Sequence, residues 1–137
     1  MTLKDIAIRA VETADPEATV ETLARIMDDA GVGSVVVTEA NRVVGVVTDR
    51  DVALTLARDA DPAALTAADV MAAEPLTLPS SAGVLELTEV MATEGVRRIP
   101  VVDDNGVIVG IVTLDDVVRL LSAELTNLAD VIEAESP

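Results

Sequence analysis

The sequence predicts an α+β fold made of two similar units, related by a pseudo-twofold axis and packed through their sheets. The first reason is an internal repeat, because residues recur at an offset of 64 positions, as Thr66 does against Thr2. The second is that each copy is expected to run helix–strand–helix–strand–strand–helix. The third is that one such unit has too few elements to cover its own apolar faces, whereas two stacked units bury both sheets. The predicted units are residues 1–62 and 63–137.

A seven-residue motif at a strand-to-helix junction is the clearest part of the repeat. It reads Gly45-Val-Val-Thr-Asp-Arg-Asp51 in the first unit and Gly110-Ile-Val-Thr-Leu-Asp-Asp116 in the second. In both copies a Thr and an Asp stand three residues apart, which is the spacing of a capping box at a helix N-terminus. The free N–H groups and partial positive charge of such a helix end also suit an anion.

An amphipathic helix dominates the rest of the first unit. Pro16 and Thr19 introduce it, apolar residues recur from Val20 to Ala30 at helical spacing, and Gly31 follows as a helix-ending residue. The other elements expected here are, in order, a short helix at 2–7, a linking segment or short strand at 8–13, strands at 34–38 and 43–47, and a helix at 49–59, after which Asp61-Pro62 ends the unit.

The second unit repeats this order. Residues 84–94 match the amphipathic helix, and Asn105-Gly106 is a strong hairpin signal between two strands rich in β-branched residues. The last helix begins at Leu114, and an apolar stripe continues or restarts beyond it through Leu125, Leu128, Val131 and Ile132. We expect this stripe to pack on the chain's own core, with another subunit as the alternative. The remaining elements expected are a short helix at 66–71, a strand at 75–78, a turn at 79–81 and strands at 98–102 and 107–112.

Composition limits the chemistry that this chain can perform. Its 137 residues include no Cys, His, Phe, Tyr or Trp, which excludes disulfides, thiol chemistry, a histidine general base and base stacking on an aromatic ring. With 25 acidic and 9 basic residues the net charge is −16, so we expect no binding of nucleic acid through a basic patch. We also expect no association with a membrane, because no apolar run is long enough to span one and no signal peptide opens the chain.

The acidic charge has two interpretations. It either serves only to keep the protein soluble, or it reflects a cytoplasm of very high salt, where charge repulsion is screened within about 3 Å at 1 M salt. A single Lys, abundant Asp and Glu, and a core of Val and Ala favour the second interpretation. The sequence therefore predicts a cytoplasmic protein from a high-salt cell.

Taken in this order, the motifs resemble those of a known family. The chain is similar to a tandem pair of CBS domains, also called a Bateman module, over nearly its whole length. The resemblance implies two β-α-β-β-α repeats and a homodimer of modules. It also implies a regulatory protein that binds AMP, ADP, ATP or S-adenosylmethionine and signals to an effector protein of unknown identity. The segments that carry the resemblance are the two seven-residue motifs, Gly31-Val-Gly-Ser-Val-Val-Val, Gly95-Val-Arg-Arg-Ile-Pro-Val-Val-Asp and Asp69-Val-Met.

The resemblance assigns the last Asp of each seven-residue motif, Asp51 and Asp116, to the ribose hydroxyls of the ligand. The chemistry agrees, because a carboxylate only accepts hydrogen bonds and therefore suits hydroxyl donors rather than phosphate. The alternative is that each Asp only completes a capping box, which is worth about 1 kcal/mol. Both roles are compatible in the unliganded protein.

Hydroxyl and guanidinium groups are the candidates for phosphate. Thr48 and Thr113 can cap their helices and also offer a hydroxyl to phosphate or ribose. The adjacent Arg97 and Arg98 precede a strand where the resembling nucleotide sensors place basic phosphate contacts. Because neighbours on a strand point to opposite faces, we expect Arg98 to be the one that reaches the cleft, with a surface ion pair as the alternative. The first unit has no arginine at the matching place, so only Arg50 could serve a second site.

An adenine base would need an apolar slot. By their family positions the candidates are Ile8, Val46, Ala72, Pro100 and Ile111, and the alternative is that these residues are plain core.

Two functions from different classes follow. The first is a ligand-sensing module that binds an adenosine-containing metabolite in one or two clefts between the repeats, with no required cofactor. The second is a non-catalytic dimerisation or docking module whose clefts have no ligand. We expect no enzyme activity, since no nucleophile stands beside a base. We expect no metal site either, because Asp103-Asp-Asn-Gly106 lacks the alternate spacing of a calcium loop.

Overall fold

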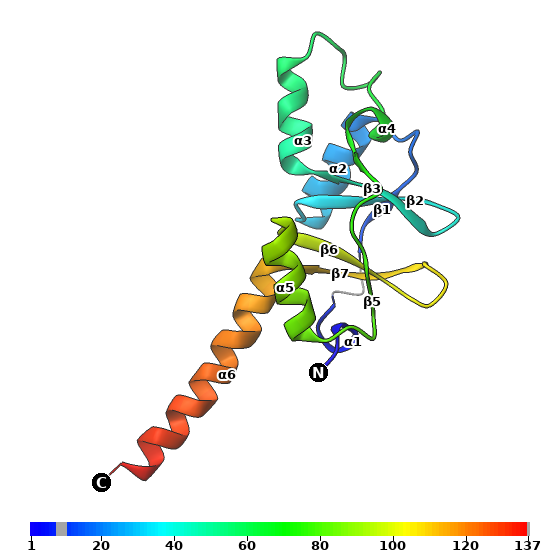
Figure 1. The fold of residues 1–137 in the computed structure, drawn as a ribbon. Coiled ribbons are helices and arrows are strands. Elements are labelled where there is room, and N and C mark those ends of the chain that lie inside the picture. The colour runs from blue at the N-terminus through cyan, green and yellow to red at the C-terminus, as the bar shows by residue number, and fades with distance from the viewer. Residues whose placement is uncertain (8–10, 137) are drawn as a thin grey trace.

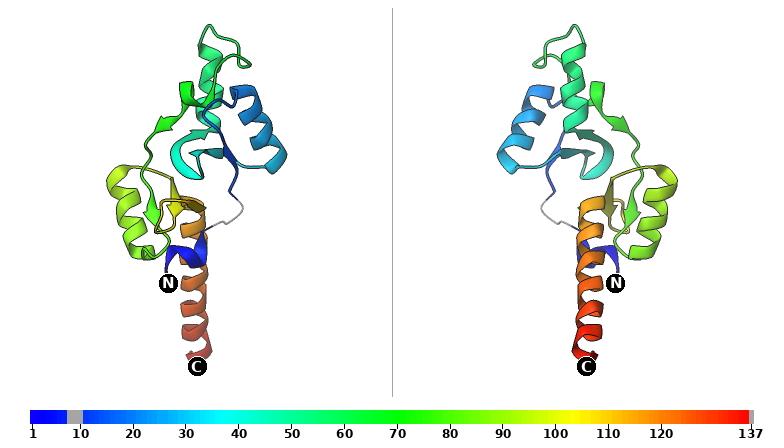
Figure 2. Two further views of the ribbon diagram at one scale, coloured as in Figure 1. Left: turned by 90° about the vertical axis from the view of Figure 1, so that its right-hand side faces the viewer. Right: turned by 90° about the vertical axis from the view of Figure 1, so that its left-hand side faces the viewer.

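The computed structural model describes residues 1–7 and 11–136, and it has the two-unit α+β architecture that the sequence predicts. The first unit lies above the second in Figure 1, and each unit carries helices against its own sheet. The last helix, α6 (Leu114–Glu135), projects from the second unit as a rod (Figures 1 and 2).

The first sheet has four strands in the order β1–β2–β3–β4. Its centre is the antiparallel hairpin of β2 and β3, in which Val35, Val36, Val37 and Val47 are fully buried. β1 runs parallel to β2, and β4 runs antiparallel to β3. The first unit supplies β1 Thr13–Ala14, α2 Val20–Ala30, β2 Ser34–Glu39, β3 Arg42–Thr48, α3 Asp49–Leu54 and a 3₁₀ turn at Thr55–Ala57, and the second unit supplies β4 Ala72–Ala73 to this sheet.

The second sheet has three strands in the order β5–β6–β7 within the described residues. β6 and β7 form the antiparallel hairpin, and β5 runs parallel to β6. Gly106, at φ +78°, occupies the turn of this hairpin, as the Asn-Gly signal predicts. The elements of this unit are β5 Leu78–Pro79, α5 Val84–Glu94, β6 Arg98–Val102, β7 Ile108–Thr113 and helix α6.

The two short entry helices, α1 Leu3–Ile6 and α4 Ala67–Val70, each pack into the opposite unit. The backbone N–H of Leu3 donates to Ala82 O at 2.9 Å, and the N–H of Ala67 donates to Ala18 O at 2.7 Å. These two bonds are equivalent under the repeat, because each residue of the second is 64 positions after or before its counterpart. The exchange holds the two units together through backbone as well as side chains.

Each unit has its own apolar core, and the entry helices complete both. Leu3 is fully buried in the core of the second unit with Leu87, Ile99 and Val112, and burying such a Leu stabilises the fold by about 2 kcal/mol. Ala67 is fully buried in the core of the first unit with Leu23, Met27, Val35, Val37 and Val47.

Three expectations about the chain need correction, and one strand was missed. The predicted strand at 75–78 is instead a two-residue strand at Leu78–Pro79, so Pro79 is not in a turn. The strand Ala72–Ala73 was not expected at all. The helix predicted at 49–59 ends at Leu54 and tightens to a 3₁₀ turn. The C-terminal stripe does not pack on the chain's own core, because Leu125 and Leu128 are 66% and 63% exposed.

Candidate functional site

Both predicted capping boxes form at the helix starts of the seven-residue motifs. Thr48 donates to Asp51 Oδ2 from its backbone N–H at 2.8 Å and from its hydroxyl at 3.0 Å, and Asp51 N–H donates back to Thr48 Oγ1 at 3.3 Å. Thr113 and Asp116 repeat this arrangement at 2.9, 2.9 and 3.2 Å. The capping role is therefore present at both helix ends.

In both boxes the second carboxylate oxygen, Oδ1, takes no part in the capping hydrogen bonds. Asp51 and Asp116 each use only Oδ2, and no hydrogen bond among the described residues reaches their Oδ1 atoms. Both side chains are half-buried, so one oxygen is held in place while the other can accept a hydrogen bond. A ligand hydroxyl is a suitable donor.

The entry helices carry the same box, and none of its four residues lines either of the two clefts described below. Thr2 caps α1 with Asp5, and Thr66 caps α4 with Asp69. The backbone N–H of the Thr is the main cause that lowers the pKa of each of these two carboxyls below its ordinary value. Substitutions in these two boxes therefore show what the loss of capping alone does to the protein.

The first cleft, of about 340 Å³, lies between the motif of the first unit and strand β6 of the second. Thr48 and Asp51 lie at its polar side, and Arg97 and Arg98 come from the other unit. Apolar side chains form the rest of the wall. The complete lining is Val46, Thr48, Asp51, Ala72, Pro75, Leu76, Val96, Arg97, Arg98 and Pro100.

The second cleft, of about 250 Å³, is its counterpart under the repeat. Thr113 and Ile111 come from the motif of the second unit, and the segment before β2 supplies the opposite wall. Two carboxylates, Glu12 and Asp115, line it, while Asp116 is held in the capping box. The complete lining is Val11, Glu12, Val32, Gly33, Ser34, Arg97, Arg98, Ile111, Thr113 and Asp115.

The same two arginines line both clefts, because they lie at the junction of the units. An added Cβ on Gly33 would come within 3.1 Å of Arg98 Nη2 and 3.2 Å of Asp49 Oδ2, so Gly33 leaves room for the half-buried Arg98 side chain. Arg97 Nη2 lies 3.8 Å from Asp115 Oδ1 in an exposed ion pair. Such a pair contributes little to stability. The second cleft therefore already pairs one of the shared guanidinium groups with its own carboxylate.

The two clefts differ in charge. Leu76 lines the first cleft, and its counterpart 64 residues earlier in the second cleft is Glu12. Asp115 adds a further acid to the second cleft, at the repeat position that Arg50 holds in the first unit. The first cleft thus combines the two guanidinium groups with one carboxylate, Asp51, and a mainly apolar wall, whereas the second combines the same groups with two carboxylates.

The first cleft brings together seven of the predicted residues from three separate segments: Val46, Thr48, Asp51, Ala72, Arg97, Arg98 and Pro100. We expected only one of the two arginines to reach the cleft and preferred Arg98, but both line it, because Arg97 precedes β6 and is not subject to the alternation of the strand. Thr113 and Ile111 line the second cleft. Arg50 is exposed and lines neither cleft, Asp116 is not among the lining residues, and Ile8 lies outside the described residues.

Several lining residues were missed from the sequence. Pro75 and Leu76 approach the first cleft, and their counterparts Val11 and Glu12 approach the second. The repeat offset could have indicated them as a pair of equivalent wall segments. Val96 was also missed, although it directly precedes the two arginines.

Metal clusters and membrane-spanning helices are both absent from the described residues. The described residues contain no group of three or more acidic side chains placed to hold a metal ion. Within residues 1–7 and 11–136, none of the helices combines the length and apolar character that a membrane crossing requires.

Comparison with known proteins points to the same repeat. The family model of the CBS domain matches residues 3–58 and 67–123. The uncharacterized protein MK0525 of Methanopyrus kandleri is 35% identical over 118 residues, which are 85% of this chain and 60% of that protein. The CBS domain-containing protein YhcV of Bacillus subtilis is 32% identical over 133 residues, which are 93% of this chain and 94% of that protein. This chain thus spans 60% of the length of the first relative and nearly all of the second.

A solved structure has the same arrangement of the two repeats. It is the CBS domain pair of protein MJ0100 in complex with 5′-methylthioadenosine and S-adenosyl-L-methionine. It superposes with a TM-score of 0.81 at 26% identity, over 90% of this chain and 98% of that one. The domain pair of MJ0100 is therefore both a fold relative and a protein that holds adenosine compounds.

Proposed function

Since this chain belongs to the CBS-domain family as a tandem pair of CBS domains, we propose that it is a regulatory module that senses an adenosine-containing metabolite. The ligand occupies a cleft between the two repeats, and the first cleft is the principal site. The chain acts on an effector protein rather than on a substrate, and it works in a high-salt cytoplasm. Its lack of His and Cys supports a role without catalysis.

The observation that carries this proposal is the composition of the first cleft. Asp51 Oδ1 is an acceptor without a partner among the described residues, which suits a ribose hydroxyl. Arg97 and Arg98 suit a phosphate or carboxylate at the far end, because guanidinium groups bind such anions with paired hydrogen bonds. Val46, Pro100 and neighbouring apolar side chains lie between and suit the faces of a purine ring. The bound compounds of the MJ0100 domain pair support the same ligand class.

The two halves of this cleft come from different repeats, so a bound ligand connects them. Thr48 and Asp51 belong to the start of α3, whereas Arg98 belongs to β6. Binding favours whichever angle between the repeats lets both halves reach the ligand. The ligand can shift this equilibrium only by its difference in affinity for the two shapes. An effector protein that contacts both repeats would detect the shift.

Thermal unfolding in about 2 M KCl, where surface charge is screened, tests the proposal. The unfolding temperature is measured alone and with millimolar AMP, ADP, ATP, 5′-methylthioadenosine or S-adenosylmethionine. A ligand at 100 times its dissociation constant stabilises the fold by about 2.7 kcal/mol, which gives a clear shift. We expect at least one of these compounds to raise the unfolding temperature.

Two matched variants separate binding from capping. Asp51→Ala removes both the capping box of α3 and the proposed ribose acceptor, whereas Asp69→Ala removes a capping box that lies on neither cleft. We expect the ligand shift to disappear in Asp51→Ala and to persist in Asp69→Ala. A folded protein that no compound stabilises would favour the alternative function, a docking module without a ligand. The exposed apolar stripe of α6 is the observation that favours this alternative.

A further inference from the structure

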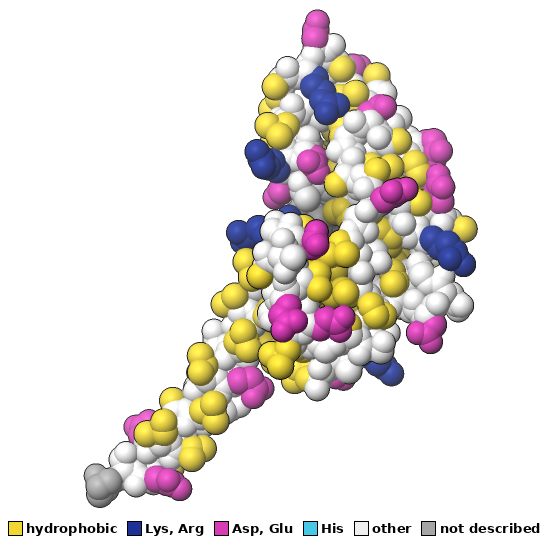
Figure 3. Space-filling view, in the orientation of Figure 1, with side chains coloured by type: hydrophobic (Ala, Val, Ile, Leu, Met, Phe, Trp, Pro, Cys, Tyr) yellow, Lys and Arg dark blue, Asp and Glu magenta, His cyan; other side chains and the backbone are white. Residues whose placement is uncertain are grey.

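Arg97 and Arg98 are the only basic side chains among the described residues that line the first or the second cleft. The whole chain has 9 basic residues against 25 acidic ones, and the basic side chains stand apart from one another on the face shown in Figure 3. A guanidinium group that binds an anion with two parallel hydrogen bonds is directed at that anion, so it contributes less to an anion in another cleft. The two clefts therefore depend on one shared pair of positive charges.

Of the two arginines, Arg97 is the one whose side chain is loosely held. Its backbone is fixed, because its carbonyl oxygen accepts from Leu114 N–H at 2.8 Å at the start of α6. Its side chain is 71% exposed, and its Nη2 reaches Asp115 Oδ1 only at 3.8 Å. Arg98, in contrast, is half-buried and packs beside Gly33. The Arg97 side chain can thus turn from one cleft to the other while the fold around it stays in place.

The ion pair of Arg97 with Asp115 has no copy in the first unit. At the matching positions of the repeat the first unit has Gly33 and Arg50. Gly33 has no side chain to offer, and Arg50 is exposed and lines neither cleft. Each chain therefore has one such pair among its described residues, and both of its members line the second cleft while Arg97 also lines the first.

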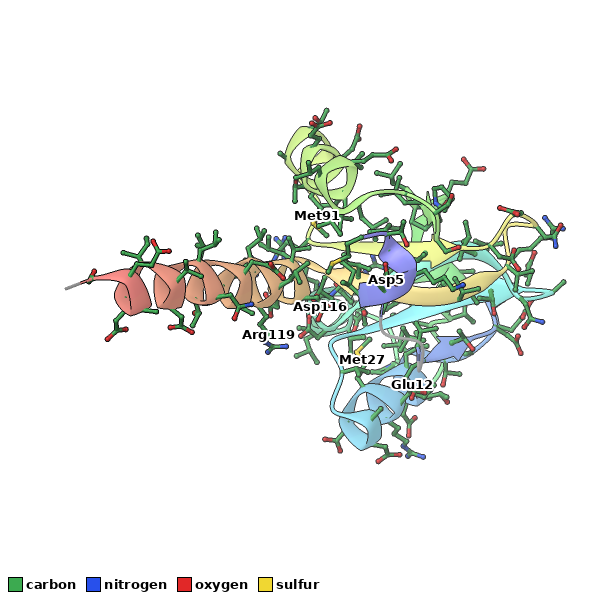
Figure 4. All side chains as sticks on the ribbon, turned by 90° about the horizontal axis from the view of Figure 1, so that it is seen from below. Asp5, Glu12, Met27, Met91, Asp116 and Arg119 are labelled. Carbon is green, nitrogen blue, oxygen red and sulfur yellow. The ribbon has the colours of Figure 1, made fainter. Side chains whose placement is uncertain are left out.

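The charges that line the second cleft depend on where Arg97 is directed. Glu12 and Asp115 carry two negative charges, which Arg97 and Arg98 balance. The acids come from both units, since Figure 4 shows Glu12 beside β1 and Asp116, the neighbour of Asp115, at the start of α6. Once Arg97 binds an anion in the first cleft, the two carboxylates face Arg98 alone, which leaves one negative charge in excess. A cleft with excess negative charge attracts a cation and repels a second anion.

We propose that Arg97 couples the two clefts through Asp115. An anionic ligand in the first cleft takes the Arg97 side chain away from Asp115, and the second cleft then prefers a cationic adenosine compound to a second anionic one. Because coupling between two sites is reciprocal, the cation strengthens binding of the anion by the same factor. This inference rests on the proposed function, since it requires adenosine compounds in the clefts, and it adds that the module responds to two ligands of opposite charge.

Methyl NMR distinguishes the two clefts, because Leu76 lines the first and Ile111 lines the second. AMP serves as the anion, and S-adenosylmethionine, with its sulfonium group, serves as the cation. The protein is titrated with S-adenosylmethionine in about 0.1 M KCl, where charges are weakly screened, once alone and once with AMP in the first cleft. We expect the Ile111 signal to reach half-saturation at about threefold less S-adenosylmethionine when AMP is present, as for the loss of an exposed ion pair.

Asp115→Asn separates this coupling from simple competition between the two compounds for one cleft. The substitution removes the charge that Arg97 uncovers, so AMP should no longer lower the amount of S-adenosylmethionine that half-saturates Ile111. Asp104→Asn is the matched control, since Asp104 is exposed and lines neither cleft, and it should keep the full effect.

Three results would overturn the coupling and leave the proposed function in place. The first is that both methyl signals shift but AMP leaves the half-saturation of Ile111 unchanged or raises it. The second is that AMP shifts Leu76 while S-adenosylmethionine never shifts Ile111. The third is that Asp115→Asn keeps the full threefold decrease. If neither compound shifts either methyl signal, the proposed function is overturned and the coupling with it.

Discussion

Thr48 and Asp51 bind each other reciprocally at the start of α3, through two hydrogen bonds donated by Thr48 and one donated by Asp51. This arrangement fixes one oxygen of the carboxylate and leaves the other directed to solvent or ligand. Capping and the proposed ribose contact thus involve the same residue. A change at Asp51 would alter both under this proposal, so the two effects must be separated by variants that alter only one.

Thr48→Ala should lower the free energy of unfolding by about 1 kcal/mol, because it removes the side chain that accepts from Asp51 N–H. Urea unfolding in high salt measures this change. Thr126→Ala is the control, since Thr126 is an exposed residue inside α6 where Ala suits the helix at least as well. An equal effect of the two substitutions would contradict the importance of the cap.

Gly45→Ala should destabilise the fold by about 1–3 kcal/mol, because its site in β3 has no room for a methyl group. An added Cβ would overlap Met71 Sδ and lie 3.0 Å from Met71 Cβ, and the latter atom cannot move without the backbone. Urea unfolding measures the loss. Gly83→Ala is the comparison, since a Cβ there meets nothing within 4 Å at φ −81°. Because Gly83 is the N-cap of α5, where Ala is less favourable than Gly, we expect a smaller loss of about 0.5–1 kcal/mol from capping alone. A loss of similar size at Gly83 would show that crowding is not the cause at Gly45.

Local patterns in the sequence were sufficient to place the longest elements. The bounds of α2 and α5 follow from apolar spacing and from Gly31 and Gly95, which both adopt φ +65°. The two-residue strands β4 and β5 could not be placed, since they are defined only by pairing with distant strands. Two residues are too few to show the alternation of apolar and polar side chains by which a strand is recognised in a sequence.

The repeat made one part of the candidate site predictable, and the family resemblance supplied Ala72, Arg98 and Pro100. Thr48 and Asp51 could be recognised because Thr113 and Asp116 repeat their spacing. The sharing of Arg97 by both clefts depends on how the units meet, which no local pattern encodes. The sequence also could not show whether the apolar stripe of α6 is buried in the chain's own core or exposed, because the same apolar spacing suits a core and an interface.

Isothermal titration should find one strong site for AMP per chain, if the module binds AMP as proposed. Both clefts depend on the same two arginines, and Glu12 and Asp115 would repel a phosphate in the second cleft. Replacing both acids, as in Glu12→Gln/Asp115→Asn, should strengthen binding in the second cleft by about threefold for each charge, from ~0.7 kcal/mol at about 6 Å in water. Two equal sites in the unaltered chain would contradict this asymmetry.

Acid should destabilise the fold partly through Asp5 and Asp69. Hydrogen bonds from the backbone N–H of Thr2 and Thr66 hold the pKa of these carboxyls below the ordinary value of 3.8. A folded-state pKa that is lowered adds stability above the unfolded-state pKa, and this stability is lost as pH falls through the folded-state value. The free energy of unfolding, measured with urea, should therefore change little above about pH 5 and decrease below about pH 4.

Asp69→Asn should make that loss less steep, because the group that must be protonated is gone. Asp104→Asn is the control, since Asp104 is exposed and accepts no hydrogen bond from the described residues. An unchanged acid dependence in Asp69→Asn would mean that this carboxyl is not linked to folding. Both variants are compared at one high KCl concentration, so that general charge repulsion is screened equally.

Salt should stabilise the fold, since the chain carries a net charge of −16. Raising KCl from 0.1 to 1 M shortens the screening distance from about 10 to 3 Å, so the free energy of unfolding should rise over this range. Asp28 and Asp29 are exposed at the end of α2, where the helix dipole is also unfavourable for acids. Asp28→Asn/Asp29→Asn should therefore stabilise the fold by about 0.5–1 kcal/mol at 0.1 M KCl and by much less at 1 M. Thr126→Ala changes no charge and should have the same effect at both concentrations. A gain in Asp28→Asn/Asp29→Asn that did not shrink with salt would mean that relief of repulsion is not its cause.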